Sequence, residues 1–164
     1  MQAHRNSSLI GRFVDPNDAI VVRDALWSEI GLLENFVRLN PAGLPQADLE
    51  IARTWRRKIQ DTFMLTKHLK KHSIFISGSR DGKVYGVVGM SDPLEDTLLF
   101  ETPCMVKTVL IPFEGKITYD SLLISYPISF GRNIKADLNR QYQDARKGGN
   151  VIETLDQSDL ALVN

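Results

Sequence analysis

The pair Asp81-Gly82 limits the fold of this chain more than any other feature of its sequence. A two-residue hairpin turn of type I′ needs positive φ angles, which Asp and Gly tolerate. Runs of β-forming residues stand on both sides of the pair, at 73–77 and 83–90. The sequence therefore predicts a hairpin at this point, and with it an antiparallel sheet.

Further strands are indicated by short runs of similar composition. Residues 62–66 form one run, and residues 104–111 and 116–124 stand on either side of a Pro-Phe-Glu-Gly turn. We expect about five strands, most of them beside their sequence neighbours, in a curled antiparallel meander.

Helical patterns precede and follow the strands. Apolar residues recur at spacings of three and four over residues 15–39 and again over 46–59, with a Pro/Gly turn between the two segments. A short helical segment is expected at 92–98, and a longer one at 134–147 ends at two glycines. The prediction is an α+β fold in which an N-terminal helical hairpin and a C-terminal helix cover the meander.

The composition is that of a globular protein. Hydrophobic residues make up 43% of the 164 residues and charged residues 24%, so the chain can bury a core without disulfides. We expect one domain over residues 1–149 and an acidic tail over 150–164, which is either disordered or docked through Val151, Ile152 and Leu155. The predicted core consists of Leu26, Ile30, Leu33, Trp55, Phe63, Ile74, Ile76, Val87, Val109, Ile111, Ile117, Leu138 and Tyr142.

The single cysteine, Cys104, has no partner for a disulfide and is expected to be a small buried side chain. Residues 1–14 lack the apolar run of a signal peptide, and no stretch approaches the roughly 18 apolar residues of a membrane span. We therefore expect a cytoplasmic protein that does not contact the membrane.

Four segments carry a resemblance to known proteins. They are Lys67–His72, Tyr85–Gly89, Leu110–Leu123 and Ile128–Gly131 with the helix that follows it. In these segments the chain resembles a group of uncharacterised bacterial proteins, some of which carry a zinc-binding SEC-C segment at the C-terminus. The resemblance implies a bacterial cytosolic domain and no particular activity. The zinc function is not implied, because the clustered cysteines and histidine of such a segment are missing here.

Basic residues are concentrated in one part of a chain whose formal net charge is zero. Residues 53–72 contain seven Lys and Arg residues and one acidic residue, Asp61, and this set of cations is named the basic band. Interleaved with Trp55 and Phe63, the band could contact the phosphates and bases of single-stranded nucleic acid; the alternative is a solvated helix face. Its members are Arg53, Arg56, Arg57, Lys58, Lys67, Lys70 and Lys71.

Two other patterns suggest chemistry but also have structural explanations. His68 and His72 have the spacing of two metal ligands on a helix, yet a zinc site needs three or four protein ligands. Ser91 stands between a strand and a short helix as a hydrolase nucleophile does, but all three histidines precede it, and helix capping explains it equally well. We expect no metal and no cofactor.

Acidic residues near the second hairpin are similarly ambiguous. Glu114 and Lys116 have the spacing of the carboxylate and lysine of metal-dependent nucleases, but here they flank a turn glycine. Asp120 follows Tyr119 in a strand, where an acidic side chain can bond to neighbouring backbone amides instead of taking part in catalysis. Residues 78–83 lack the glycine spacing of a phosphate-binding loop.

The leading hypothesis is a non-catalytic binding module whose basic band engages an acidic partner, either nucleic acid or protein. The alternative is a hydrolase or metal-dependent nuclease that uses Asp120, Glu114, Lys116 or Ser91. Formation of a homo-oligomer through an exposed apolar face or a sheet edge is a third hypothesis, since a meander leaves its edges unpaired.

Overall fold

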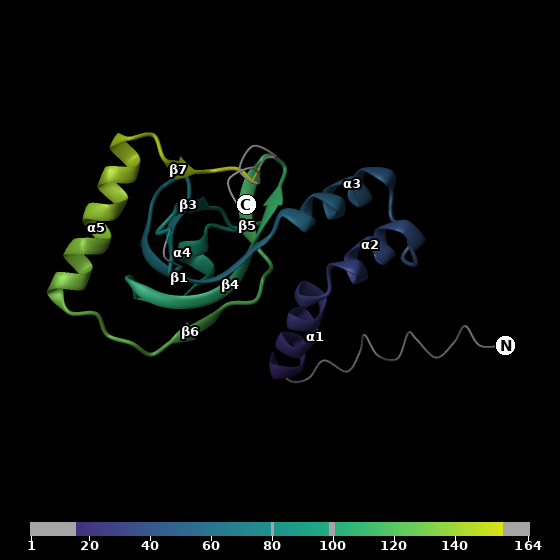
Figure 1. Ribbon diagram of the computed structural model, residues 1–164, viewed down its shortest axis with the longest axis horizontal. Helices are drawn as coiled ribbons and strands as arrows, with labels where there is room; N and C mark the ends of the chain where they lie inside the picture. The colour runs from purple at the N-terminus through teal and green to yellow at the C-terminus, as the bar shows by residue number, and fades with distance from the viewer. Residues whose placement is uncertain (1–15, 80, 99–100, 156–164) are drawn as a thin grey trace. The chain divides into compact units, whose positions relative to one another are not determined.

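The computed structural model describes residues 16–79, 81–98 and 101–155, and its contacts divide the chain into two compact units. The helical unit extends to Arg56 and contains helices α1 to α3 (Figure 1). The sheet unit begins at Arg57 and contains every described strand. The single domain over 1–149 stays a prediction, and the two units are described separately.

The helical unit consists of α1 (Pro16–Ser28), α2 (Ile30–Leu39) and α3 (Gln46–Thr54), and a 3-10 turn (Trp55–Arg57) follows α3. The pattern over 15–39 predicted one helix, but Glu29 leaves the helical region, with φ −125° and ψ 80°, and separates α1 from α2. Asn40 ends α2 in a left-handed conformation with φ 44°, and its side-chain amide bonds both the N–H and the C=O of Leu44. α2 and α3 thus form the predicted helical hairpin.

The sheet unit begins with a strand where the sequence predicted the end of a helix. Strand β1 starts at Ile59, so the second helical pattern, expected to run to that residue, is shorter than predicted. The two predicted hairpins, β2–β3 and β4–β5, are confirmed, as are the short helix, the C-terminal helix and the α+β class. The described elements are β1 (Ile59–His68), β2 (Ser73–Ser77), β3 (Val84–Val87), α4 (Leu94–Thr97), β4 (Cys104–Phe113), β5 (Lys116–Tyr119), β6 (Ile124–Tyr126), α5 (Arg132–Lys147) and β7 (Val151–Ile152).

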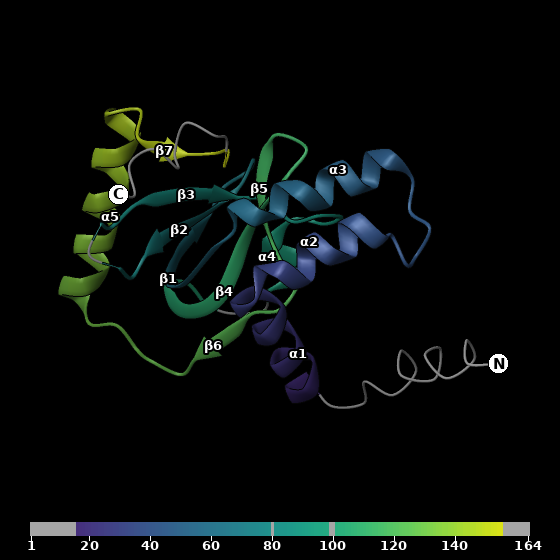
Figure 2. The ribbon, with the colours of Figure 1, turned by 45° about the vertical axis from the view of Figure 1, so that its right-hand side comes forward.

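Strand β1 closes the sheet into a barrel because it pairs with two different strands. Residues 59–65 pair with β4 and residues 63–68 pair with β2, with a register irregularity between Leu65 and Lys67. The ring runs β1-β2-β3-β5-β4 and returns to β1, while β6 is added beside β4 and β7 beside β3. The sheet is therefore mixed and not a plain meander, since β5 lies between β3 and β4 and runs parallel to β3. The strands curl around a common axis in Figure 1 and are seen more from the side in Figure 2.

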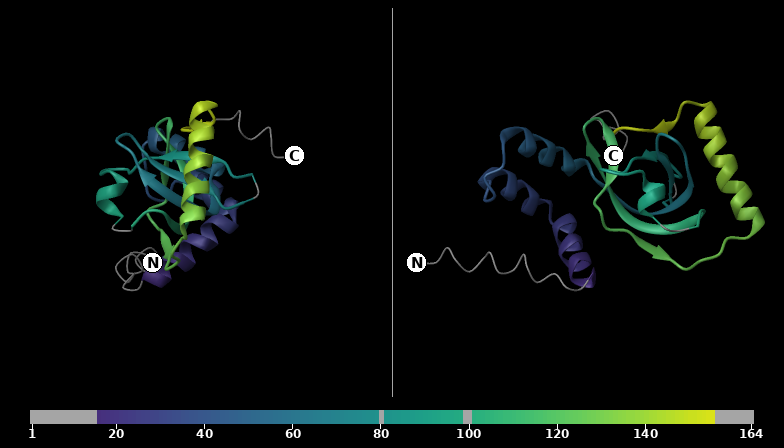
Figure 3. Two further views of the ribbon diagram at one scale, coloured as in Figure 1. Left: turned by 90° about the vertical axis from the view of Figure 1, so that its left-hand side faces the viewer. Right: turned by 180° about the vertical axis from the view of Figure 1, so that it is seen from behind.

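The interior of the barrel is filled by aromatic and aliphatic side chains. Phe63 meets Phe75 and Tyr85 edge to face, with ring centroids 5.9 and 6.0 Å apart. Each such pair contributes about 1 kcal/mol beyond the burial of its area. Leu94, the first residue of α4, and Leu98, which follows its last residue, are buried in the same cluster. Figure 3 shows this helix across one end of the ring.

A second apolar layer lies outside the ring, over β2. Because side chains alternate along a strand, Ile74 and Ile76 face away from the interior. They form a buried cluster with Leu138 and Tyr142 of α5. All the residues of β2 are therefore buried, and α5 is fixed along this face of the sheet.

Most of the predicted core is confirmed, but Leu26, Ile30 and Trp55 are only partly buried. Leu26 and Ile30 flank the break at Glu29, which interrupts the expected apolar stripe, and Trp55 lies in the 3-10 turn after α3. Among the described residues, no helix has both the length and the apolar composition needed to cross a bilayer.

The first residues of the predicted acidic tail are docked. Val151 and Ile152 form β7, which pairs in parallel with β3, and Leu155 is buried in the barrel cluster. Residues 156–164 lie outside the described part of the chain.

Gly89, between β3 and α4, should not tolerate a side chain, because a Cβ atom there would lie 1.8 Å from the backbone oxygen of Asp92. We expect Gly89→Ala to lower the free energy of unfolding by about 1–3 kcal/mol, since backbone atoms must shift. At Gly131 a Cβ atom would meet nothing within 4 Å, so Gly131→Ala should change the free energy of unfolding by less than about 0.5 kcal/mol. Urea denaturation measures both variants, and equal unfolding free energies would contradict the prediction.

Candidate functional site

The structure divides the basic band between the two units. Arg53 and Arg56 belong to the helical unit, whereas Arg57 and all later members belong to the sheet unit. Within the sheet unit, Lys67 lies near the end of β1, and Lys70 and Lys71 lie in the β1–β2 loop. A run of cations in the sequence is thus two groups in the fold.

The sheet-unit group borders a pocket of about 660 Å³. One wall is the β1–β2 loop, which contributes Lys70, Lys71 and His72. The other comes from the C-terminal half of α5, which contributes Tyr142 and Arg146. The fold therefore adds to the band a cation, Arg146, that lies far from it in the sequence.

Lys67 holds this arrangement together. Its Nζ donates a hydrogen bond of 2.7 Å to Asn139 Oδ1 and lies 4.7 Å from the centroid of the Tyr142 ring. Both partners are on α5, so Lys67 fastens the end of β1 to that helix. We therefore assign Lys67 a structural role beside the pocket.

Lys70, Lys71 and Arg146 are exposed, and no carboxylate of the described residues pairs with any of them. The acidic side chain on the pocket wall, Glu153, instead has its Oε1 3.8 Å from His72 Nδ1. Three cations thus border one pocket and form no ion pair with the carboxylates that the structure describes, which is an arrangement that attracts anions.

The two histidines have separate structural roles. His68 Nδ1 lies 2.7 Å from Ser73 Oγ, across the β1–β2 pairing. The His72 ring covers Gly86 of β3, where a Cβ atom would come within 3.1 Å of it. In the described part of the chain, no group of three His, Cys, Asp or Glu side chains could hold a metal ion.

Only two of the four residues of the enzyme hypothesis meet in one site. Ser91 and Lys116 border a pocket of about 350 Å³ on another side of the β1–β2 loop, which His68, His72 and the two loop lysines also line. Within the described residues Ser91 hydrogen-bonds neither histidine. Asp120 accepts a 3.3 Å hydrogen bond from the N–H of Leu122 and so closes the turn after β5. Glu114 is exposed in the β4–β5 turn, with φ 48°. Neither carboxylate borders the pocket of Ser91.

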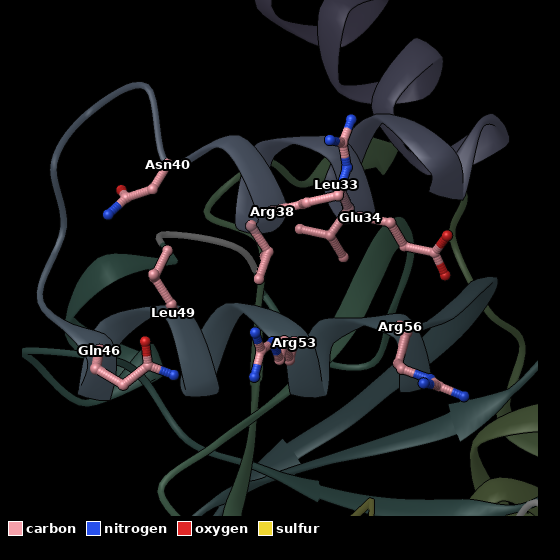
Figure 4. Close-up of a pocket in the computed structure, with 9 residues that line it drawn as sticks. Leu33, Glu34, Arg38, Asn40, Gln46, Leu49, Arg53 and Arg56 are labelled. Carbon is pink, nitrogen blue, oxygen red and sulfur yellow. The ribbon is translucent and has the colours of Figure 1, made fainter.

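The helical-unit group borders a groove of about 470 Å³ between α2 and α3 (Figure 4). Arg53 and Arg56 line it from the α3 side, and Arg38 lines it from α2. Arg38 precedes the segment that defined the basic band, so sequence reasoning missed it. Arg38 lies on α2 and not on α3, so only a prediction that α2 packs against α3 would have placed it in the groove. The apolar lining consists of Leu33, Val37 and Leu49, all buried.

Neighbouring polar side chains hold the rim of this groove in place. Glu50 Oε1 accepts hydrogen bonds of 2.6 Å from both Gln46 Nε2 and Arg53 Nη1. On α2, Asn35 Oδ1 accepts a hydrogen bond of 3.0 Å from Arg38 Nη2. The groove therefore has ordered donors on both walls before any ligand arrives.

No protein-family model matches the chain, and no curated protein or solved structure matches it either. The resemblance to uncharacterised bacterial proteins accordingly stays a prediction.

Described polar side chains in and beside the β2–β3 loop, residues 78–83, hydrogen-bond to one another. The Ser77 hydroxyl donates a 2.5 Å hydrogen bond to Asp61 Oδ2, and the Ser79 hydroxyl donates a 2.7 Å hydrogen bond to Asp81 Oδ1. The bond from Ser79 lowers the pKa of Asp81, although partial burial opposes this. These groups stabilise the hairpin and do not form a phosphate cradle.

Removing the Ser79 hydroxyl should raise the pKa of Asp81. Because this pKa is lower in the folded than in the unfolded chain, the carboxylate stabilises the fold above its unfolded pKa, and the contribution is lost as the pH falls through the folded value. In Ser79→Ala the loss of folding stability at acid pH that comes from Asp81 should therefore be smaller. NMR titration of Asp81 measures the shift, and Ser28→Ala, which removes an exposed hydroxyl in the helical unit, should leave the titration unchanged.

Cys104 should react slowly with thiol reagents in the folded protein. The side chain is buried at the start of β4, and burial raises the pKa of its thiol, so little thiolate forms at neutral pH. We expect alkylation by iodoacetamide at least about tenfold slower than in the urea-unfolded chain. Equal rates in the two states would show that the thiol is accessible.

Proposed function

We propose that this protein is a non-catalytic binding module that contacts the phosphate backbone of nucleic acid through Lys70, Lys71 and Arg146. The observation that carries the proposal is the meeting of these three exposed cations, from a loop and a helix, around one pocket, where none of them pairs with a carboxylate of the residues that the structure describes. Most protein–nucleic acid contacts go to phosphate and sugar, and Lys and Arg make many of them.

The architecture supports nucleic acid over an acidic protein by analogy. Five-stranded Greek-key barrels of the OB type bind oligonucleotides through a sheet face and the loops beside it, including the loop between the first two strands. Here α5 covers the outer face of β2, whereas the β1–β2 loop with its two lysines stays exposed. Fold analogy alone does not establish function, so the charge cluster carries the proposal.

The enzyme alternative has less support. Ser91 lacks a hydrogen bond to either histidine within the described residues, and Asp120 and Glu114 lie outside its pocket. A nucleophile and its base are expected within hydrogen-bond reach of each other. The bacterial and cytoplasmic character of the protein belongs to the same proposal and is supported by the sequence resemblance and by the single cysteine.

Charge reversal at the loop tests the proposal. Binding of a fluorescein-labelled single-stranded oligonucleotide, followed by anisotropy over a series of salt concentrations, should weaken in Lys70→Glu/Lys71→Glu and in Arg146→Glu. For the double variant the slope of log K against log salt should fall by about 1.4, which is about 0.7 for each lost phosphate contact.

Lys135→Glu is the matched control. It reverses an exposed charge on the same helix, about 16 Å from Arg146 along the helix axis, and should leave affinity and slope nearly unchanged. Equal weakening by all variants would indicate unspecific attraction. If polyglutamate bound and the oligonucleotide did not, the partner at this site would be an acidic protein.

A further inference from the structure

The groove between α2 and α3 combines two features that the sheet-unit pocket does not. Its apolar lining comes from Leu33, Val37 and Leu49, and arginines stand on both sides of that lining. Arg38 lies on the α2 wall and Arg53 on the α3 wall, as Figure 4 shows. Glu34 also lines the groove and Glu50 forms an ion pair with Arg53. Arg38 and Arg56, in contrast, pair with no carboxylate of the described residues. The cationic rim is thus only partly neutralised, and a ligand that is apolar along its middle and negatively charged along its edges fits it.

We propose that this groove binds an acidic amphipathic peptide segment of a partner protein, with an apolar side chain over Leu33 and Leu49 and carboxylates on Arg38 and Arg53. Grooves between helices commonly receive such segments. Guanidinium groups match carboxylates in geometry and can bond them through two parallel hydrogen bonds.

The rim is ordered before binding, which lowers the entropy cost of forming the contacts. Glu50 holds Arg53 and Gln46, and Asn35 holds Arg38. Each of these bonds uses one nitrogen of the arginine, so further N–H donors of Arg38 and Arg53 remain for a ligand.

Helix α2 also offers apolar surface next to the groove. Leu32, Phe36 and Leu39 recur at spacings of four and three and are 44%, 36% and 64% exposed. With Leu33 and Val37 in the groove, α2 is apolar over more than one face, and a helix of that kind usually has a protein on each apolar face. A small anion such as free phosphate would leave this surface uncovered, which favours a peptide.

The proposal is independent of the proposed nucleic-acid site, because every residue lining the groove belongs to the helical unit. The probe is a fluorescein-labelled peptide of glutamate and leucine in amphipathic helical spacing, titrated with the full chain. We expect Arg38→Gln/Arg53→Gln to weaken its binding about tenfold, the effect of losing two exposed charge pairs. Oligonucleotide binding should stay unchanged in the same variant.

Arg140→Gln is the matched control, because Arg140 forms an exposed ion pair with Asp137 three residues away, as Arg53 does with Glu50. This variant and Lys70→Gln/Lys71→Gln should bind the peptide as the unchanged chain does. A peptide with glutamine in place of glutamate should bind about tenfold more weakly than the acidic one.

Four outcomes would overturn the proposal: no binding of the acidic peptide at millimolar concentration, equal binding of the glutamine peptide, unchanged binding in Arg38→Gln/Arg53→Gln, or equal weakening in the Lys70→Gln/Lys71→Gln variant. The last outcome would place acidic peptides on the sheet unit. Circular dichroism of each variant ensures that lost binding does not come from lost folding.

Discussion

The pairing of β1 with both β4 and β2 is the interaction on which the sheet unit depends. It joins what would otherwise be the two edges of a sheet, so the ring has no long exposed edge through which chains could aggregate. The contact between β3 and β5 also completes the ring but contains fewer backbone pairings. Val87 pairs with Ile117, and the Val88 N–H donates to the Ile117 carbonyl. The long antiparallel pairing of β1 with β4 therefore carries most of the closure.

Closure also explains why α5 lies where it does. In a closed ring Phe75 points inward, so Ile74 and Ile76 must face outward, and this apolar surface has to be covered. Leu138 and Tyr142 cover it, and one turn beyond Tyr142 the same helix carries Arg146 to the β1–β2 loop. The candidate anion site thus follows from hydrophobic packing: the helix is fixed by its apolar face, and its polar end completes the cluster.

Local features of the fold were predictable, and pairings between distant segments were not. Asp81-Gly82 predicted the β2–β3 hairpin correctly, and Gly82 does adopt φ 55°. The turn type was wrong, because the strands are joined by a loop over residues 78–83 and not by a two-residue type I′ turn. Nothing local reports that Val87 pairs with Ile117, so the ring was missed and a meander expected. The break at Glu29 was missed for another reason, because glutamate is a good helix former and gives no local signal of a helix end. The short β7 was foreseen only as docking of Val151 and Ile152.

The same distinction applies to the candidate sites. The basic band was defined by position in the sequence, yet charges act together only within about a Debye length, near 8 Å at physiological salt. In the fold each part of the band is completed by an arginine from outside it, Arg146 in the sheet unit and Arg38 in the helical unit. Different surroundings then select different ligands. Exposed cations at a loop suit evenly spaced phosphates, whereas arginines on both sides of buried leucines suit a chain that is acidic at its edges and apolar between them.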